Sequence, residues 1–325
     1  MRIGIIAPPW MPIPPPSYGG IEMVVDVMAR GLVAAGHEVL LAAPADSTCP
    51  VPMVPGLPPS QRARLGAAAV ELPYVLSAYA GMSDVDVIHD HTVTGPFCAP
   101  RPLPAPVVTT NHAPFDSEIG VAYRYLPSDV ALVAISRSQA AAAVSTQVCR
   151  VIHHGIDVSA VPVGPGDGGY VSFLGRMDPG KGVREAALVA RAAGVPLKIA
   201  AKMSEAPERE YFESQVQPLL GEDVEYVGEL GPADKYRLVG EAQALLNPLQ
   251  WPEPFGLVMV EALACGTPVV TTPCGAAPEI VEDGVTGFVR DSAAALTAAL
   301  KQADRLDRAA CRRSAETAFS AERMV

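Results

Sequence analysis

Short apolar runs alternate with helix-like patterns along the chain, and this alternation restricts the folds that it can adopt. Segments such as Ile21–Ala35 place apolar residues on one face at helical spacing. Alternating strands and helices predict parallel sheets that are covered by helices on both sides. The runs expected as strands form two groups of five: Ile3–Ala7, Glu38–Ala42, Val85–His89, Val107–Thr110 and Ala131–Ile135, then Tyr170–Leu174, Leu197–Ala201, Val224–Tyr226, Ala244–Leu246 and Val269–Thr272.

A stretch rich in glycine and proline, Asp157–Gly169, separates the two groups. We interpret it as a linker between two α/β halves of similar size. The expected divisions are residues 1–157, residues 158–303, and a C-terminal helix at residues 304–325 that could return toward the first half. Ligands of such sheets bind at the carboxyl ends of the strands, so we expect the halves to face each other across a cleft.

Composition excludes several classes of protein. The net charge of the 325-residue chain is −11 and no run of lysine or arginine occurs, which disfavours nucleic acid and anionic membranes as partners. The six cysteines include no C-x-x-C pair, as is typical of reduced thiols. No apolar run is long enough for a signal peptide or a membrane-spanning helix. We therefore expect a soluble, cytoplasmic protein with no integral membrane association.

The segment Glu253–Glu261 reads E-P-F-G-L-V-M-V-E and predicts a helix start with a carboxylate at each side. A helix N-terminus offers backbone N–H groups and a positive dipole end to phosphate. The two carboxylates can accept hydrogen bonds from hydroxyl groups. This pattern indicates a ligand that is both anionic and polyhydroxylated, as a nucleotide-sugar is.

The segment Leu174–Gly182 follows the first expected strand of the second half and contains Arg176 and Lys181. A planar guanidinium and a compact ammonium together suit a diphosphate. Two such charges in a loop are often only solvated, but the position at a strand end favours a binding role. In the first half, a proline-rich segment leads to Gly19-Gly20, which we interpret as a possible clamp for an anion or a sugar.

With these residues, the chain resembles the family-4 glycosyltransferases of the GT-B fold, which are retaining enzymes that use nucleotide-sugars. The resemblance covers nearly the whole chain in the expected order. Further matching segments are Gly19-Gly20, Gly36–Val39, Val87–His89, Asn111-His112, Ile135-Ser136, Gly155–Asp157, Gly228–Leu230, Gly275–Val281 and Asp283–Gly287.

The resemblance implies two Rossmann-like parallel-sheet domains, with the acceptor on the side of residues 1–157 and the nucleotide-sugar held by residues 158–303. It also implies roles for individual residues. These are His112 and Glu253 in catalysis, Gly19, Gly20, Arg176 and Lys181 at the donor diphosphate, the backbone of Phe255, Gly256 and Leu257 at the donor sugar and phosphate, Glu261 at the ribose, and Leu230 at the base.

The implied reaction is transfer of a sugar from a nucleoside diphosphate to a hydroxyl of a soluble acceptor, which is a small molecule or a glycoconjugate. UDP is the first choice of nucleotide and GDP the second, and neither a metal nor another cofactor is expected. The alternative is a nucleotide-sugar epimerase of similar shape. A nicotinamide-dependent oxidoreductase is disfavoured because no G-x-G-x-x-G follows the first strand, and an inactive sugar-nucleotide-binding protein is disfavoured by the intact acids and cations.

Two further patterns resemble metal sites. Asp84-Val85-Asp86 has the form of an Asp-x-Asp metal motif, but it leads into an apolar run, so we expect it to cap a strand edge. His89 and His91 alternate at the end of the same strand, and histidines on one face can ligate zinc. Residues that line a cleft are the commoner interpretation of such a pair.

Overall fold

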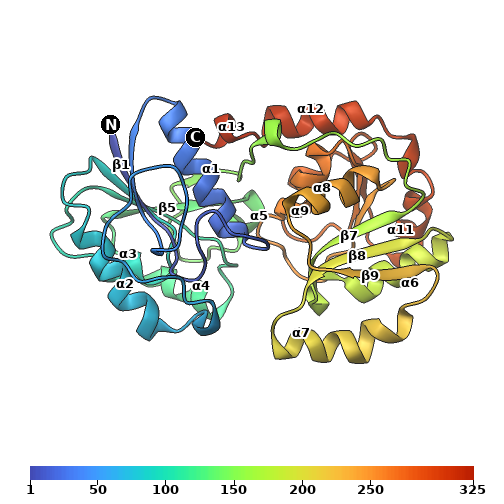
Figure 1. The fold of residues 1–325 in the computed structure, drawn as a ribbon, viewed down its shortest axis with the longest axis horizontal. Helices are drawn as coiled ribbons and strands as arrows, with labels where there is room; N and C mark the ends of the chain where they lie inside the picture. The colour runs from blue at the N-terminus through green and yellow to red at the C-terminus, as the bar shows by residue number, and fades with distance from the viewer. The chain divides into compact units, whose positions relative to one another are not determined.

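The computed structural model describes residues 1–325, except for the side chain of Ile119. The chain forms two compact units (Figure 1), and each is described by itself. Unit 1 comprises Met1–Gly155 together with Ala321–Val325, and unit 2 comprises Ile156–Ser320. The chain therefore passes from unit 1 to unit 2 after Gly155 and returns after Ser320.

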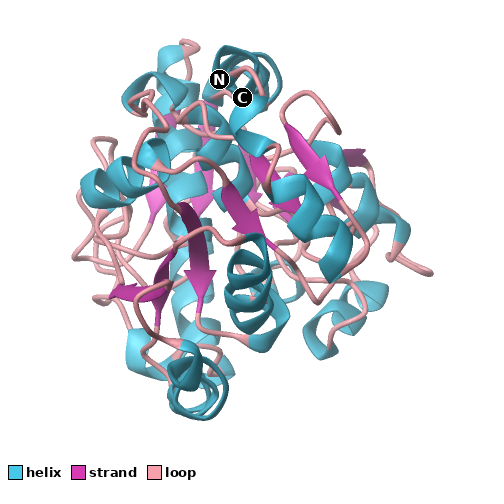
Figure 2. Cartoon of the chain, turned by 90° about the vertical axis from the view of Figure 1, so that its right-hand side faces the viewer, coloured by secondary structure: helices cyan, strands magenta, loops and turns pink.

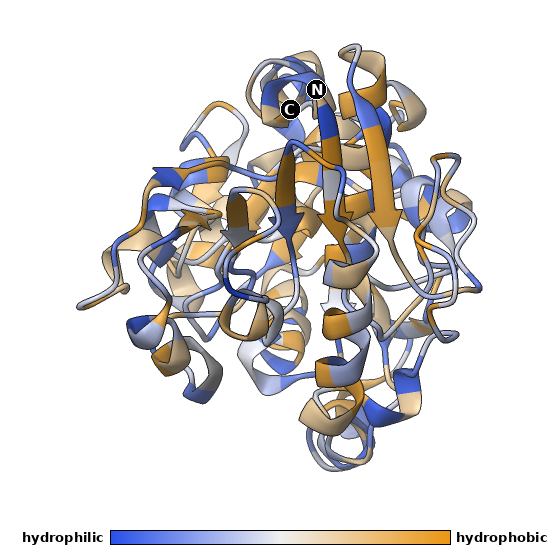
Figure 3. Ribbon diagram, turned by 90° about the vertical axis from the view of Figure 1, so that its left-hand side faces the viewer, coloured by the Kyte–Doolittle hydropathy of each residue, from blue (hydrophilic) through white to orange (hydrophobic). Residues whose placement is uncertain are grey.

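Unit 1 is built on a parallel sheet with the strand order β2-β1-β3-β4-β5-β6. Ile5, Ile88 and Leu132 of this sheet are fully buried, and the strands near the chain termini are mostly hydrophobic (Figure 3). Apolar strands that are buried on both faces are typical of parallel sheets. The strands are β1 (Arg2–Ile6), β2 (Glu38–Ala42), β3 (Val87–Asp90), β4 (Val107–Thr110), β5 (Val130–Ala134) and β6 (Arg150–Val151).

The helices of unit 1 include one from the distant C-terminal segment. Val325, just after α13, packs on α1, because a Cβ added at Gly31 would lie 2.7 Å from Cγ2 of Val325. The sulfur of the buried Met324 accepts a hydrogen bond from the Gly155 N–H (3.2 Å). The helices are α1 (Gly20–Ala34), α2 (Ala68–Ala80), α3 (Gly95–Cys98), α4 (Glu118–Ala122), α5 (Arg137–Ala141) and α13 (Ala321–Met324).

Unit 2 repeats this architecture with the strand order β12-β11-β10-β7-β8-β9, again parallel throughout. Its strands lie among helices on both sides (Figure 2). The strands are β7 (Val171–Arg176), β8 (Leu197–Lys202), β9 (Val224–Gly228), β10 (Leu245–Asn247), β11 (Val269–Thr271) and β12 (Gly287–Val289). The helices are α6 (Val183–Ala193), α7 (Ala206–Tyr211), α8 (Pro232–Glu241), α9 (Leu257–Ala264), α10 (Ala277–Ile280), α11 (Ala293–Leu300) and α12 (Arg308–Ala318).

The ten expected strands are all present, with ends shifted by at most two residues, and the predicted class of two parallel-sheet α/β domains is confirmed. Two strands were missed: β6 and β12 are edge strands of two and three residues that lack a continuous buried apolar run. Such short edge strands carry too few side chains for a period to be recognised.

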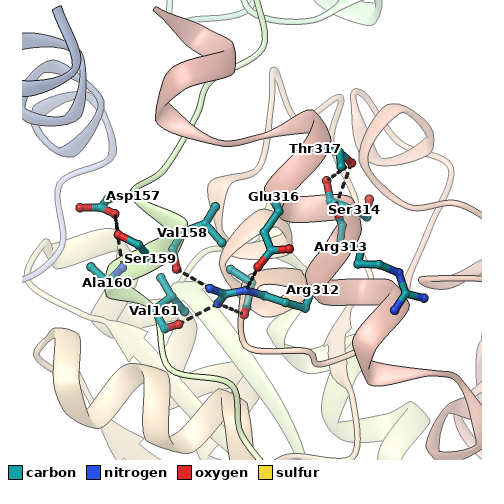
Figure 4. Close-up of polar contacts among 11 residues, drawn as sticks. Asp157, Val158, Ser159, Ala160, Val161, Arg312, Arg313, Ser314, Glu316 and Thr317 are labelled. Atoms are coloured by element: carbon teal, nitrogen blue, oxygen red, sulfur yellow. Dashed lines mark hydrogen bonds and ion pairs between the residues drawn. The ribbon is translucent and has the colours of Figure 1, made fainter. Parts of the chain in front are cut away.

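The segment expected as a linker, Asp157–Gly169, is part of unit 2 and is bonded to it. The Arg312 guanidinium donates to the carbonyl oxygens of Val161 (2.8 Å) and Val158 (3.0 Å), as Figure 4 shows. Arg308 donates to the Gly164 carbonyl (3.1 Å) in the same way. Two arginines of α12 therefore attach to unit 2 a segment that its glycines and prolines had led us to interpret as a linker.

Candidate active site

The loop after β7 is shaped by tight backbone contacts that place Lys181. The Asp178 carboxylate accepts a hydrogen bond from the Gly180 N–H (2.8 Å), which turns the chain at the end of the strand. Gly182 then has φ +75°, and a Cβ there would overlap the carbonyl oxygen of Pro248. Only glycine meets both demands at this position. Lys181 is thereby fixed at the carboxyl end of β7, directly before α6.

Lys181 forms an ion pair with Glu253, which lies 72 residues further along the chain. Their side chains are only 14% and 12% exposed, so the pair is largely removed from solvent. Trp251 joins them: its indole Nε1 donates to Glu253 Oε2 (2.9 Å), and its ring centroid is 4.8 Å from Lys181 Nζ. The predicted diphosphate lysine and the predicted sugar-binding acid are therefore in direct contact.

The backbone around Glu253 is held by a second glycine. Gly275 has φ +59°, and a Cβ there would overlap the backbone of Glu253. The Ala276 N–H donates to the Glu253 carbonyl (2.9 Å), so the segment that carries the acid is fastened to the start of α10. Two residues after Phe255, helix α9 begins at Leu257, preceded by Gly256 at φ +101°. The N–H groups of its first turn have no carbonyl one turn earlier in the helix.

Glu261, in the second turn of α9, is almost fully buried and pairs with a residue that the sequence did not single out. Lys235 of α8 donates to Glu261 Oε1 (2.6 Å), and the two side chains are 13% and 4% exposed. Burying an unpaired carboxylate would be costly, so the lysine accounts for its burial. The sequence offered one indication of this role: Lys235 lies in the helix that follows β9, close to the carboxyl edge of the sheet.

Arg176 and Leu230, the other two predicted residues of unit 2, lie at the same edge of the sheet. Arg176 is the last residue of β7 and pairs in register with Lys202 of β8. Leu230 follows β9 by two residues, and its side chain packs against the buried cluster that contains Tyr170 and Leu238. Because the Leu230 side chain packs against the core, chiefly the backbone of this residue can contact a ligand.

In unit 1, His112 belongs to a row of four histidines at the carboxyl ends of β3, β4 and β6. We call His89, His91, His112 and His154 the histidine row. Consecutive ring centroids are 4.2, 5.2 and 5.1 Å apart. His91 Nδ1 lies 2.9 Å from His112 Nε2, and His89 Nε2 lies 2.8 Å from Thr110 Oγ1. The sequence pattern predicted His112 as a site residue, but it did not predict that His112 contacts His91 and His154.

Burial determines the charge state of the histidine row. It lowers the pKa of His89 to about 4 and that of His154 to about 3. The pKa values of His91 and His112 are lowered well below their usual range by burial, with neighbouring imidazoles adding to the effect. His112 is therefore a neutral imidazole at pH 7, suited to hydrogen bonding and not to charge neutralisation.

Gly19 and Gly20 mark the start of α1, where the proline-rich segment arrives. A Cβ at Gly19 would lie 2.7 Å from Cβ of Pro15 and 3.0 Å from Glu22 Oε2. The glycine is thus required for packing, whatever ligand it meets. Burial raises the pKa of Glu22 to about 7, which makes this carboxyl group unusual among the acids of the chain.

The two metal-like patterns have other contacts. Asp86 accepts a hydrogen bond from the Arg2 N–H (2.7 Å), and Asp84 pairs with the Arg2 guanidinium. Both acids precede β3 and so lie at the amino edge of the sheet, away from the histidine row at its carboxyl edge. Among the described residues, no group of three or more His, Cys, Asp or Glu side chains could hold a metal ion.

The predicted residues thus fall into two sets. Unit 2 brings Lys181 into contact with Glu253 and places Glu261 on the helix that follows, whereas Gly19, Gly20 and His112 belong to unit 1. Each set lies around the carboxyl ends of parallel strands, where α/β proteins bind their ligands. Two parallel-sheet units, each with polar residues at the carboxyl ends of its strands, are the architecture of a two-domain α/β enzyme.

Comparison with known proteins identifies this class more closely. Residues 18–160 match the model of glycosyltransferase family 4, and residues 168–303 match that of the glycosyl transferases group 1. The chain belongs to the family-4 glycosyltransferases of the GT-B fold. The match decides in favour of a transferase over the epimerase alternative.

The relatives include enzymes of lipid and natural-product glycosylation. Phosphatidyl-myo-inositol mannosyltransferase of Mycolicibacterium smegmatis is 30% identical over 327 residues, which span 88% of this chain and 80% of the relative. AviGT4, a glycosyltransferase of avilamycin A biosynthesis, is 26% identical with a TM-score of 0.75, covering 99% of this chain and 94% of that one. HepE of Anabaena, solved with UDP and glucose, shares the fold at 21% identity, with a TM-score of 0.75 over 99% and 96% of the two chains.

Over the part of the chain that is described, none of the helices combines the length and the apolar character needed to cross a bilayer.

Proposed function

We propose that the protein is a retaining glycosyltransferase that moves a sugar from a nucleoside-diphosphate sugar to a hydroxyl of its acceptor. The observation that carries this proposal is the pairing of two acids with two lysines around the start of α9. Lys181 pairs with Glu253 before the helix, and Lys235 pairs with Glu261 within it. This arrangement offers cations for phosphate and carboxylate oxygens for hydroxyl groups within one short segment.

Each part of the donor has a proposed partner in unit 2. Arg176 and Lys181 bind the diphosphate, assisted by the N–H groups of Phe255, Gly256 and Leu257. Lys235 binds Oε1 of Glu261 and orients the carboxylate. The other oxygen, Oε2, accepts hydrogen bonds from the ribose hydroxyls. Leu230 meets the base through its backbone.

Catalysis in this proposal depends on stabilising the leaving diphosphate. The cations and the dipole of α9 favour the negative charge that develops as the glycosidic bond breaks. Glu253 is held by Lys181 and Trp251 and serves to bind the sugar. His112 of unit 1, the other proposed catalytic residue, is a neutral imidazole that can offer a hydrogen bond. Attack of the acceptor on the same face as the departing phosphate, which takes the acceptor proton, retains the anomeric configuration.

For the donor, UDP is the first nucleotide to test and GDP the second. HepE of Anabaena has been solved in complex with UDP and glucose and in complex with UDP-glucose. For the acceptor, a soluble hydroxyl compound remains our proposal, and the named activity of the mycobacterial relative makes phosphatidyl-myo-inositol the matched lipid to test beside it. The protein would carry out this transfer in the cytoplasm.

Calorimetry and product analysis test the proposal together. UDP and GDP should be titrated into the protein, with a Glu261→Gln variant as the matched control. A donor that binds should then be incubated with acceptor, and the anomeric configuration of the product read by NMR. Binding of a nucleoside diphosphate and a product of retained configuration are expected. An inverted product would overturn the retaining mechanism, and no binding of either nucleotide would overturn the donor assignment.

We further propose that the reaction needs no divalent metal, because Arg176, Lys181 and the start of α9 already neutralise the diphosphate. Turnover should be unchanged within about two-fold by excess EDTA, since metal clamps and protein cations perform the same task. Loss of turnover in EDTA that Mn²⁺ restores would contradict this. Asp84→Asn and Asp86→Asn variants would then show whether the Asp-x-Asp pattern is the site.

A further inference from the structure

Trp251 lies between two residues of the proposed donor site and contacts both. Its indole N–H donates to Glu253 Oε2 (2.9 Å), and Lys181 Nζ, 4.8 Å from its ring centroid, pairs with the same oxygen. Both hydrogen bonds to the Glu253 carboxylate thus end on Oε2. Oε1 is the oxygen through which Glu253 can meet a sugar hydroxyl.

The indole is itself held by the backbone of the neighbouring loop. A Cβ added at Gly180 would lie 3.2 Å from Cγ of Trp251, so the ring rests directly on this glycine. The Gln250 N–H donates to the Gly180 carbonyl (2.8 Å), which fastens the two loops one residue before the tryptophan. The position of the N–H donor is therefore set by backbone, whereas Lys181 reaches Glu253 through four flexible methylene groups.

The Lys181 ammonium and the Trp251 indole N–H, which both donate to Glu253 Oε2, differ in how strongly they bind a diphosphate. An ammonium has three donors and no acceptor, and it binds phosphate oxygens strongly, so a diphosphate competes with Glu253 for Lys181. An indole N–H is a neutral donor that gains less from phosphate. When Lys181 turns to the diphosphate, the carboxylate keeps one of its two donors, and that donor is Trp251.

We propose that Trp251 is a positioning residue that holds Glu253 in place while Lys181 exchanges its contact with Glu253 for one with the donor diphosphate. This inference rests on the proposed function, and it adds a residue that acts on the sugar through Glu253. Trp251 carries no chemistry of its own. Its hydrogen bond keeps the Glu253 carboxylate in position when Lys181 moves to the diphosphate.

The first test uses fluorescence, because the chain has only two tryptophans, Trp10 and Trp251. In a Trp10→Phe variant, a cation leaving the face of the remaining indole should change its emission, and the change should saturate with UDP or GDP. The matched Trp251→Phe variant, which keeps Trp10, should show no such change. If Trp10→Phe does not fold, the wild-type response minus that of Trp251→Phe gives the same information.

The second test separates positioning from structure. Trp251→Phe keeps a ring beside Gly180 and Lys181 but removes the N–H. It should lower kcat for sugar transfer about ten- to a hundred-fold, the usual range for a hydrogen bond to a charged group, and leave UDP or GDP affinity within about two-fold. Adding Trp251→Phe to Glu253→Gln should cause no further loss, because the two residues act as one unit.

The outcomes distinguish this inference from the function on which it rests. If neither nucleotide binds and no sugar is transferred, the proposed function fails. If nucleotide binds and sugar is transferred, but Trp251→Phe retains wild-type kcat or its loss adds fully to that of Glu253→Gln, the proposed function stands and the role of Trp251 is overturned. An unchanged emission of Trp251 at nucleotide saturation would overturn the exchange of Lys181.

Discussion

Each of the two carboxylates that the sequence places eight residues apart is held by a lysine from another element of unit 2. Glu253 is held by Lys181 of the β7–α6 loop, and Glu261 by Lys235 of α8. Removing one partner of a buried pair leaves a charge without compensation, which costs more than the pair itself contributes. Substitutions at these positions must therefore be read against changes in stability.

Glu261→Gln should weaken binding of the donor nucleotide about ten- to a hundred-fold, because the ribose hydroxyls lose a charged acceptor. Lys235→Met should weaken it as well, and the double variant should lose less than the two single losses combined. Calorimetry measures the affinities, with the exposed Glu282→Gln as the control. Unchanged affinity in Glu261→Gln would refute the ribose assignment.

His112→Ala should lower kcat by about 10²-fold or more while changing nucleotide affinity little, because the proposed nucleotide-binding side chains belong to unit 2. Steady-state kinetics and calorimetry on the same preparation give both values. His91→Asn tests whether the 2.9 Å contact between the two rings orients His112. Equal losses in affinity and turnover would assign His112 a structural role.

The lowered pKa of His89 makes stability depend on pH. The unfolded chain binds a proton on this ring below about pH 6.5, whereas the folded chain excludes it until about pH 4. The contribution of neutral His89 is therefore complete above pH 6.5 and is lost as the pH falls toward 4. One such group changes the free energy of unfolding by at most about 1.4 kcal/mol per pH unit.

Urea unfolding of wild type and His89→Gln at about pH 7, 6 and 5 measures this dependence as a difference between the two proteins. The difference is needed because burial raises the pKa values of Glu22 and Asp90, to about 7 and about 6, and these acids act in the opposite direction. Identical pH slopes for the two proteins would show that His89 takes up its proton over the same pH range in the folded and the unfolded state.

At the scale of secondary-structure elements, the site depends on loops that touch through glycine. Gly275→Ala should displace the segment that carries Glu253, because its φ is +59° and the added Cβ overlaps the Glu253 backbone. We expect sugar transfer to fall by more than ten-fold and the melting temperature to drop. Gly194→Ala is the control, since it shares the strained backbone (φ +72°) but meets no atom within 4 Å. Equal effects of the two substitutions would show that the overlap of the new Cβ with the Glu253 backbone is not the cause.

Sequence reasoning found the elements better than the contacts between them. Buried parallel strands are visible as continuous apolar runs, so ten strands and the start of α9 could be predicted. The contact of Lys235 with Glu261 spans 26 residues, and those of Arg312 with Val158 and Val161 span about 150. No local pattern encodes such pairs, which is why Lys235 was missed and why the bonds that attach residues 157–169 to unit 2 were not foreseen.

At the scale of the whole molecule, unit 1 is formed from two separate parts of the chain. Met324, on α13, is buried in unit 1 with 7% exposure. Met324→Ala should destabilise unit 1 by roughly 2–5 kcal/mol, and amide exchange should accelerate in α1 but not in β7 or β8 of unit 2. The exposed Glu322→Ala on the same helix is the control. Uniform acceleration across both units would show that they unfold as one.

The order of synthesis gives this discontinuity a biological consequence. On a translating ribosome, residues 156–320 emerge as one uninterrupted segment and can complete their sheet at once. The sheet of unit 1 is also complete within the first 155 residues, but residues 321–325, which cover α1 at Gly31, are made only after unit 2. During that interval the nascent chain presents the surface of α1 around Gly31 that Val325 later covers, and a chaperone that recognises exposed apolar surface could bind it there.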